Sequence, residues 1–160
     1  FFLFLIYIIV KRHPSQTVYS CESLRFSNIE FMNNDDLNTE GVDLYSLLHY
    51  SDALISDYSS VSVDYMLLNR PIAYCLTDYE DYQDKRGFVF ANPLEYMPGN
   101  HIYSFEDLME FLVSLTNGYD LYATDRERLM PAMHNRCDDY CKRIMEYVGA
   151  INDGQTSSDS

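Results

Sequence analysis

The sequence lacks a glycine-rich phosphate loop. Its six glycines form neither the G-x-x-x-x-G-K-[ST] pattern of a P-loop nor the G-x-G-x-x-G pattern of a dinucleotide-binding turn. Tryptophan is also absent, although tyrosine and phenylalanine bring the aromatic content to 15%. Two common classes of nucleotide site are therefore not supported, and the aromatic residues indicate a packed globule rather than a disordered chain.

Positive charge is scarce. The chain has 11 lysines and arginines against 25 aspartates and glutamates, which gives a formal net charge of -14. Such a field repels nucleic acid and anionic lipid headgroups, so we expect no nucleic-acid partner. A nucleotide would be repelled as well, unless basic groups and helix N-termini are concentrated at one site.

Few residues are suited to holding a metal ion. Cys137 and Cys141 are spaced i and i+4 with His134 nearby, but no second ligand pair follows at the spacing of a zinc site. We therefore expect no metal and no cofactor, with reduced thiols of a cytoplasmic protein. Cys75 lies in an apolar run and is expected to be a small buried hydrophobic residue.

No apolar run is long enough to cross a membrane. The longest, Phe1–Val10, has ten residues, where a span needs about 20. The basic residues follow this run instead of preceding it, which does not fit a signal peptide. We expect a central parallel strand buried on both faces, and a chain that begins inside such a strand is expected to be part of something longer.

The rest of the chain predicts alternating strands and helices. The expected strands are 28–32, 53–56 and 72–76, and the expected helices are 43–50, 61–69, 104–117, 122–134 and 138–150. Thr77–Asn100 is expected to be a long functional connection. This order predicts an α/β fold with a parallel sheet and right-handed crossovers. The length suits one domain over residues 1–150, and the Ser-rich residues 151–160 are expected to be a disordered tail.

The residues that carry chemistry follow the strand at 53–56. Ser59 and Ser60 are expected to cap the next helix, where free backbone N–H groups and two hydroxyls can bind a phosphate. Asp64 comes one turn later and suits ribose or glycerol hydroxyls. The junction is at the carboxyl end of a parallel strand, where open α/β sheets bind ligands. A capped helix without a ligand is the alternative.

Three blocks of sequence carry a family resemblance. Asp52–Tyr74 (DALISDYSSVSVDYMLLNRPIAY) resembles the central signature of the CDP-glycerol glycerophosphotransferases, which build teichoic acids and capsular polymers. Asp78–Phe90 (DYEDYQDKRGFVF), followed by Pro98-Gly99, resembles the downstream block. Lys11–Pro14 resembles the basic turn that precedes the signature. The similarity extends over about residues 5–115.

The resemblance implies the fold and the partners. The family has two Rossmann-like halves, the arrangement called GT-B, and this chain is similar to the C-terminal, nucleotide-binding half. The implied reaction transfers glycerol phosphate from CDP-glycerol to a hydroxyl of a lipid-linked polymer or glycan acceptor. The implied location is the cytoplasmic side of the bacterial membrane, with peripheral attachment. The N-terminal domain would be a separate, necessary part, and the isolated chain is expected to be inactive.

The same resemblance implies roles for single residues. Ser59, Ser60 and Asp64 would contact CDP-glycerol, and His13 would act in catalysis by binding the donor pyrophosphate. Arg86 is a candidate for a phosphate contact, because a guanidinium can bind a phosphate with two hydrogen bonds. A pair with Asp81 or Asp84 that anchors the loop is its alternative role.

Two other functions stay open from the sequence. One is a GT-B glycosyltransferase that uses a nucleotide sugar, although the serine pair and the lack of a glycine-containing phosphate loop argue against it. The other is a truncated, non-catalytic remnant. Ala91-Asn92 and Asn100 depart from the family pattern in the downstream block, which fits such a remnant.

Overall fold

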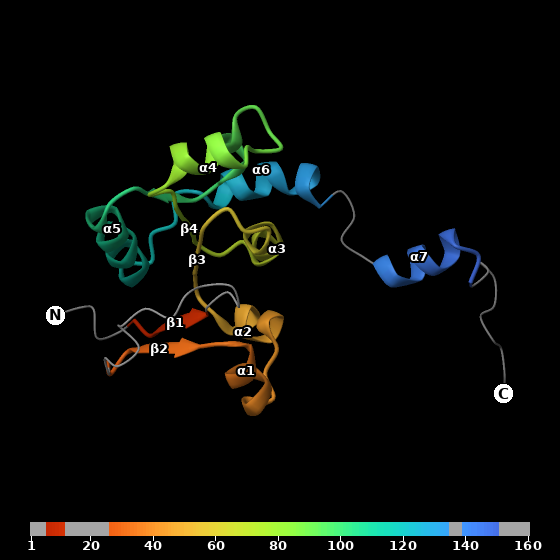
Figure 1. Ribbon diagram of the computed structural model, residues 1–160, viewed down its shortest axis with the longest axis horizontal. Helices are drawn as coiled ribbons and strands as arrows, with labels where there is room; N and C mark the ends of the chain where they lie inside the picture. The colour runs from red at the N-terminus through yellow and green to blue at the C-terminus, as the bar shows by residue number, and fades with distance from the viewer. Residues whose placement is uncertain (1–5, 12–25, 135–138, 151–160) are drawn as a thin grey trace.

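The computed structural model describes residues 6–11, 26–134 and 139–150. Parallel strands and flanking helices alternate along the chain (Figure 1). The strands are β1 (Ile8–Lys11), β2 (Ile29–Met32), β3 (Leu54–Ser56), β4 (Ile72–Cys75) and β5 (Asn100–Ile102). The helices are α1 (Asn34–Glu40), α2 (Leu44–Tyr50), α3 (Val61–Tyr65), α4 (Tyr79–Lys85), α5 (Phe105–Thr116), α6 (Ala123–Met133) and α7 (Tyr140–Tyr147). The expected α/β class with a parallel sheet is confirmed.

The described strands form two parallel sheets. In one, β1 pairs with β2, and Ile8 lies opposite Ile29. In the other, the order is β3-β4-β5, with Ser56 opposite Tyr74 and Tyr74 opposite His101. The side chains of Ile6 and Ile8 pack against the core of the larger sheet, so the two sheets are in contact.

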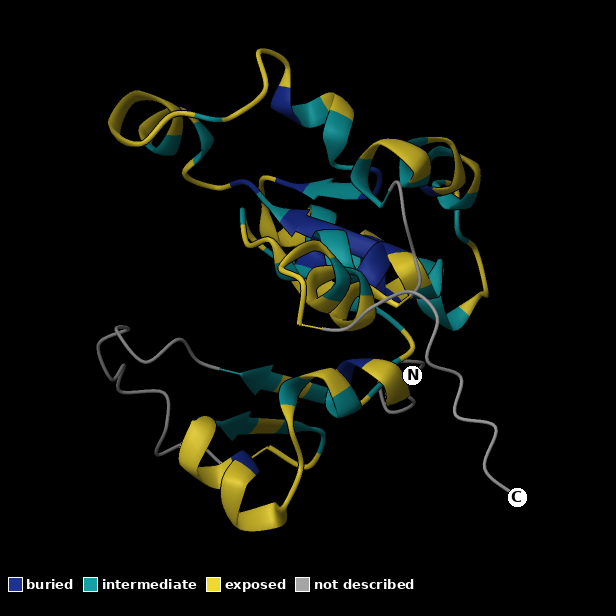
Figure 2. Ribbon diagram, turned by 90° about the vertical axis from the view of Figure 1, so that its right-hand side faces the viewer, coloured by how far each residue is buried: buried dark blue, intermediate teal, exposed yellow. Residues whose placement is uncertain are grey.

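The central strand buried on both faces is β4, and not the first strand as predicted. Ile72, Ala73 and Tyr74 are all 1% exposed or less (Figure 2). On β1, exposure alternates, and Ile9 is 37% exposed. The predicted strand Phe1–Val10 is longer than the observed one. Of its described residues, Ile6 and Tyr7 come before Ile8, the first residue that pairs with β2. Residues 1–5 lie outside the described part.

Alternate residues of β4 pack into two cores. Ile72 and Tyr74 face a cluster with Tyr65 and Met66 from the α3 segment. Ala73 faces the other cluster, with Phe111 and Leu112 of α5. Helices therefore cover both faces of the strand that adjoins the candidate site, and its position is fixed from both sides.

Side-chain capping hydrogen bonds mark the starts of α5 and α2. Ser104 begins α5 with a reciprocal capping box with Asp107, as the sequence predicts for this serine. Asp43 caps α2 by accepting a hydrogen bond from the backbone N–H of Ser46 at 2.9 Å. The 61–69 helix is also confirmed, although its last turn, Met66–Leu68, is a 3-10 helix that ends at Asn69 in the left-handed conformation.

The 77–100 connection is more regular than predicted. It contains α4, a 3-10 turn at Pro93–Tyr96 and the start of β5. Gly99 has a packing role at that start, because a Cβ atom there would lie 2.2 Å from the carbonyl oxygen of Ile72. The Pro98-Gly99 pair thus allows β5 to approach β4.

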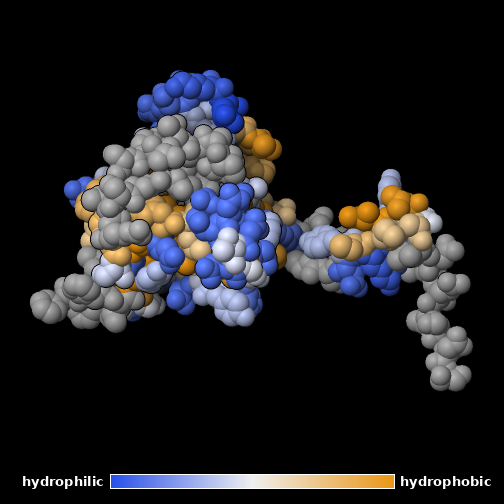
Figure 3. Space-filling model, turned by 60° about the horizontal axis from the view of Figure 1, so that its bottom comes forward, coloured by the Kyte–Doolittle hydropathy of each residue, from blue (hydrophilic) through white to orange (hydrophobic). Residues whose placement is uncertain are grey.

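Helix α7 follows residues 135–138, which lie outside the described part, and it is drawn apart from the other elements (Figure 1). Its apolar residues gather on one side and its polar residues on the other (Figure 3). Ile144, Met145 and Val148 are all exposed. The predicted tail, 151–160, lies outside the described residues. In the part of the chain that is described, no helix has the length and apolar character of a membrane span.

Candidate functional site

The β3–α3 junction is held by hydrogen bonds within the turn. The backbone N–H of Ser59 donates to Oδ1 of Asp57 at 3.0 Å, which closes an Asx turn directly after β3. The carbonyl oxygen of Ser59 accepts from both the N–H and the hydroxyl of Ser62, at 3.2 and 2.9 Å. The buried Ser62 therefore fixes the position of Ser59 from the helix side.

The serine pair does not cap α3 in the way predicted. Ser60 is at the N-cap position, but its φ of -61° and ψ of -14° are already helical, and its side chain makes no capping bond. A capping side chain needs an extended backbone to reach the N–H groups of the next turn. The Ser59 hydroxyl accepts from the N–H of Val61 only at 3.4 Å. Both hydroxyls are exposed beside the junction and are thus accessible to a ligand.

Asp64 lies one turn into α3 and has a partner within the chain. Its Oδ2 accepts a hydrogen bond from the hydroxyl of Tyr45 on α2 at 2.9 Å. This hydrogen bond raises the pKa of Tyr45, because the neutral phenol is its donor. The other carboxylate oxygen of Asp64 accepts no hydrogen bond from the described residues, so it remains available to a ligand hydroxyl.

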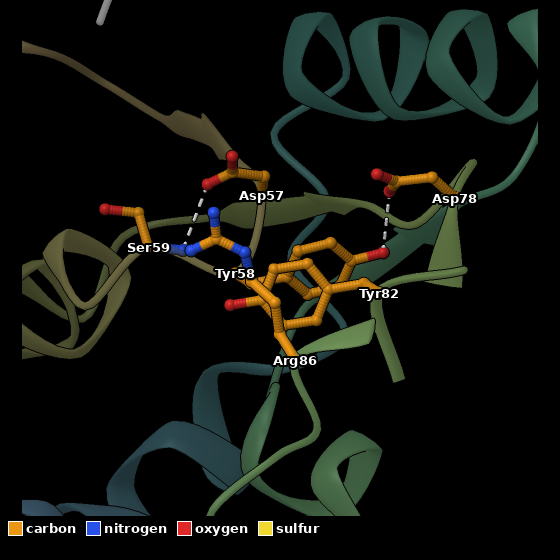
Figure 4. Close-up of a pocket in the computed structure, with 6 residues that line it drawn as sticks. All are labelled: Asp57, Tyr58, Ser59, Asp78, Tyr82 and Arg86. Atoms are coloured by element: carbon orange, nitrogen blue, oxygen red, sulfur yellow. Dashed lines mark hydrogen bonds between the residues drawn. The ribbon is translucent and has the colours of Figure 1, made fainter. Parts of the chain in front are cut away.

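A hollow of about 390 Å³ lies beside Ser59 (Figure 4). It is lined by Asp57, Tyr58, Ser59, Asp78, Tyr82 and Arg86. Three of these follow β3, and the other three come from the segment after β4. The hollow is therefore at the carboxyl ends of two adjacent parallel strands, where α/β sheets commonly bind ligands. Of the predicted residues, the structure brings Ser59 and Arg86 together here, while Ser60 and Asp64 are not part of the lining.

Arg86 is the basic residue of the hollow, and its guanidinium has no hydrogen-bond or ion-pair partner among the described residues. The alternative role as a loop anchor is not observed. Asp81 pairs instead with Lys85 at 2.6 Å, and Asp84 forms no pair within the described part. The guanidinium of Arg86 projects among the other lining side chains (Figure 4). Its N–H donors are therefore available to an anion.

An aromatic cluster forms the wall of the hollow. The rings of Tyr58 and Tyr82 are 4.0 Å apart, and Phe88 contacts both. The hydroxyl of Tyr58 donates to Oδ1 of Asp78 at 2.9 Å. Burial raises the pKa of Tyr58, and the hydrogen bond to Asp78 raises it further, so this phenol remains a neutral donor near pH 7.

Asp57 and Asp78 were not predicted as site residues, and Tyr82 was expected only to pack. One signal could have found the two aspartates, since each follows a predicted strand and parallel neighbours end at the same edge of a sheet. The place of Tyr82 in the lining had no comparable signal, because α4 was predicted to be part of a loop.

Two predictions concern residues that lie wholly or partly outside the described part of the chain. His13 is in the segment 12–25, so the structure does not test its role. Of the C-x3-C pair, Cys137 also lies outside, while Cys141 is exposed. Among the residues that are described, no three His, Cys, Asp or Glu side chains group in a way that could hold a metal ion.

The parallel sheets and their flanking helices define a Rossmann-like α/β fold. Residues 5–148 match the CDP-Glycerol:Poly(glycerophosphate) glycerophosphotransferase family, and the chain belongs to that family. The resemblance inferred from the three sequence blocks is thereby confirmed.

Relatives with curated descriptions are teichoic acid enzymes. The chain is 35% identical over 104 residues to the teichoic acid glycerol-phosphate primase of Bacillus subtilis (strain 168), covering 64% of this chain and 25% of that protein. It is 45% identical over 62 residues to the teichoic acid ribitol-phosphate primase of Bacillus spizizenii, covering 38% of this chain and 15% of that protein. The chain thus matches a quarter or less of these relatives.

A solved structure has a similar fold. The wall teichoic acid polymerase TagF matches with a TM-score of 0.57 and 26% identity, over 90% of this chain and 33% of that one. The likeness agrees with the Rossmann-like class predicted from the sequence.

Proposed function

We propose that the protein containing this chain transfers glycerol phosphate from CDP-glycerol to a hydroxyl of a lipid-linked polymer or glycan in cell-wall or capsular polymer synthesis. In this proposal, residues 1–150 form the donor-binding domain. The observation that carries it is the guanidinium of Arg86, which has no partner among the described residues, beside the exposed Ser59 at the carboxyl ends of β3 and β4. Family membership supplies the donor class.

The proposed reaction is a phosphoryl transfer. The acceptor hydroxyl attacks the β-phosphorus of CDP-glycerol, the bond from this phosphorus to the bridging oxygen breaks, and CMP leaves with that oxygen. Catalysis of this kind depends on positioning and on stabilising negative charge. Arg86, His13 and the hydroxyls of Ser59 and Ser60 would carry out these tasks for the pyrophosphate.

Asp64 has a different role in the proposal. Its free carboxylate oxygen would accept a hydrogen bond from a ribose or glycerol hydroxyl, since a carboxylate repels phosphate. The acceptor and the base that deprotonates it would belong to a second Rossmann-like half. Peripheral attachment to the inner face of the membrane would bring that half to a lipid-linked acceptor.

The test is calorimetric titration of the chain with CDP-glycerol, after circular dichroism has shown that it is folded. We expect weak, saturable binding without turnover, and loss of binding in the double variant Ser59→Ala, Ser60→Ala. CMP, CDP-ribitol and UDP-glucose serve as comparison ligands. Preference for UDP-glucose would favour a glycosyltransferase instead. A folded chain that binds none of the four would contradict the proposal.

A further inference from the structure

The hollow beside Ser59 contains more than a phosphate site would require. Arg86 is one cation, yet two carboxylates, Asp57 and Asp78, line the same space (Figure 4). Carboxylates repel a phosphate and weaken the attraction of the guanidinium. A hollow built for phosphate alone would not contain them, so they point to a second kind of ligand group.

Each carboxylate has one internal hydrogen bond in the described structure. Oδ1 of Asp57 accepts from the N–H of Ser59, and Oδ1 of Asp78 accepts from the hydroxyl of Tyr58. Neither aspartate forms an ion pair with a described residue, and Oδ2 of each accepts no hydrogen bond from one. Because an ionised carboxylate accepts about four hydrogen bonds, both aspartates have acceptor capacity left for a ligand.

Hydrogen bonds within the chain also hold the carboxylates of Asp57 and Asp78 in place. Asp57 is fixed by the Asx turn after β3, and Asp78 by the phenol of Tyr58, whose ring packs on Tyr82 at 4.0 Å. The two turns follow strands that pair in parallel, with Ser56 opposite Tyr74. Fixed acceptors next to a guanidinium that pairs with no described residue match a ligand in which hydroxyl groups lie close to a phosphate.

We infer that Asp57 and Asp78 accept hydrogen bonds from hydroxyl groups next to the donor phosphate, and that they are specificity-determining residues for a phosphate-linked diol. This inference rests on the proposed function and deepens it. The diol could belong to the polyol of the donor or to its ribose, which have the same hydrogen-bonding chemistry. Asp64 lies outside the lining, so its contact would be separate.

Replacement of either aspartate by asparagine should weaken ligand binding, whereas simple electrostatics predicts stronger binding. Asp57→Asn and Asp78→Asn keep an Oδ1 that can accept from Ser59 or Tyr58, while they replace the second acceptor oxygen by an NH₂ group. Removal of negative charge beside an anionic ligand should strengthen its binding. Loss of hydrogen bonds from ligand hydroxyls to a carboxylate should instead weaken binding about tenfold for each aspartate.

The experiment is calorimetric titration of the wild-type chain and the variants with CDP-glycerol and with CMP. The matched control is Asp84→Asn, an exposed position on α4 outside the hollow with the same change in charge. We expect about tenfold weaker CDP-glycerol binding in each hollow variant and unchanged or slightly tighter binding in the control. Weakening for CDP-glycerol alone assigns the diol to the polyol, and equal weakening for CMP assigns it to the ribose.

Other results would overturn the inference. Unchanged or tighter binding by both hollow variants would show that the carboxylates do not accept from the ligand. Wild-type binding that disappears in EDTA would show that they hold a cation instead. If the folded wild-type chain binds neither ligand, the proposed function fails first and the inference fails with it. If wild-type binds and the variants match it, only the inference fails.

Discussion

Arg126 of α6 holds Asn69, the residue that ends the α3 segment. Its Nε donates to Oδ1 of Asn69 at 3.0 Å, and its Nη2 donates to the Asn69 carbonyl oxygen at 3.4 Å. The guanidinium also pairs with Asp120, and the side chain is fully buried. Asn69 has a φ of 46°, an uncommon conformation for a residue other than glycine. The contact therefore fixes the far end of the helix that begins at the serine pair.

Replacement of Arg126 by alanine should destabilise the chain strongly. The change leaves Asp120 and Asn69 without their buried partner, and such losses cost about 3 kcal/mol or more. Arg128→Ala is the matched control, because Arg128 is on the same helix and pairs with Asp125 at 2.9 Å on the surface. Its loss should cost less than about 1 kcal/mol. Urea unfolding measures both, and equal costs would contradict the buried contact.

Gly99→Ala should disturb the junction of β4 and β5. The new Cβ atom would lie 2.2 Å from the Ile72 carbonyl oxygen, a backbone atom that cannot rotate away. We expect a loss of about 3 kcal/mol, as for overpacking elsewhere in cores. Gly118→Ala is the control, since a Cβ atom there meets nothing within 4 Å and only the φ of +69° opposes it. Its cost should be about 1 kcal/mol, and thermal unfolding would distinguish the two.

The capping box of α5 predicts a pH dependence. Oδ2 of Asp107 accepts from the N–H groups of Tyr103 and Ser104, each at 2.9 Å. The Tyr103 bond and then the Ser104 side chain lower the pKa of Asp107 below its ordinary value. The unfolded chain therefore takes up this proton first as pH falls below about 4. The stabilisation is present above that pH and is lost as pH falls through the lowered pKa.

The midpoint of thermal unfolding, measured from pH 6 to pH 3, tests this dependence. Asp107→Asn should lower the midpoint at pH 6 and flatten its decline below pH 4. Asp84→Asn is the control, because Asp84 accepts no hydrogen bond within the described part of the chain. Parallel curves for wild type and Asp107→Asn would contradict the assignment.

Lys85, the last residue of α4, and its neighbour Arg86 should differ in their effect on ligand affinity. Arg86 lines the hollow without a described partner, whereas Lys85 pairs with Asp81 at 2.6 Å. Arg86→Gln should weaken CDP-glycerol binding at least about tenfold, the cost of a charge-assisted hydrogen bond. Lys85→Gln makes the same change in charge and should alter the affinity less than about twofold. Equal effects in calorimetry would indicate only a general loss of positive charge.

The sequence predicted the parallel class because apolar runs such as Ile72–Leu76 stand out between polar turns. It missed β5, since Asn100–Ile102 contains only one strongly apolar residue. It also missed α4, which has no continuous apolar face and packs through Tyr79 and Tyr82 against Phe88. These elements depend on tertiary contacts that a local pattern does not contain.

Only part of the candidate site was predicted from the sequence, because the rest also depends on tertiary contacts. The serine pair and Arg86 were found from motifs, and the structure brings Ser59 and Arg86 to one hollow. Asp57 and Asp78 were missed because their proximity depends on the pairing of β3 with β4 and on the hydroxyl of Tyr58. The capping role of Ser60 was wrong, since residue preferences do not fix the backbone angles of a particular turn.

The hydrogen bond from Tyr58 to Asp78 joins the turn after β3 to the turn after β4. The spacing of these turns is thereby set before any ligand arrives, which is preorganisation. A ligand that contacts both turns does not need to immobilise them, a cost of about 0.5–1.5 kcal/mol for each side chain ordered on binding. Tyr58→Phe would therefore reduce affinity through the conformational entropy of the unbound chain, even for a ligand that never touches the phenol.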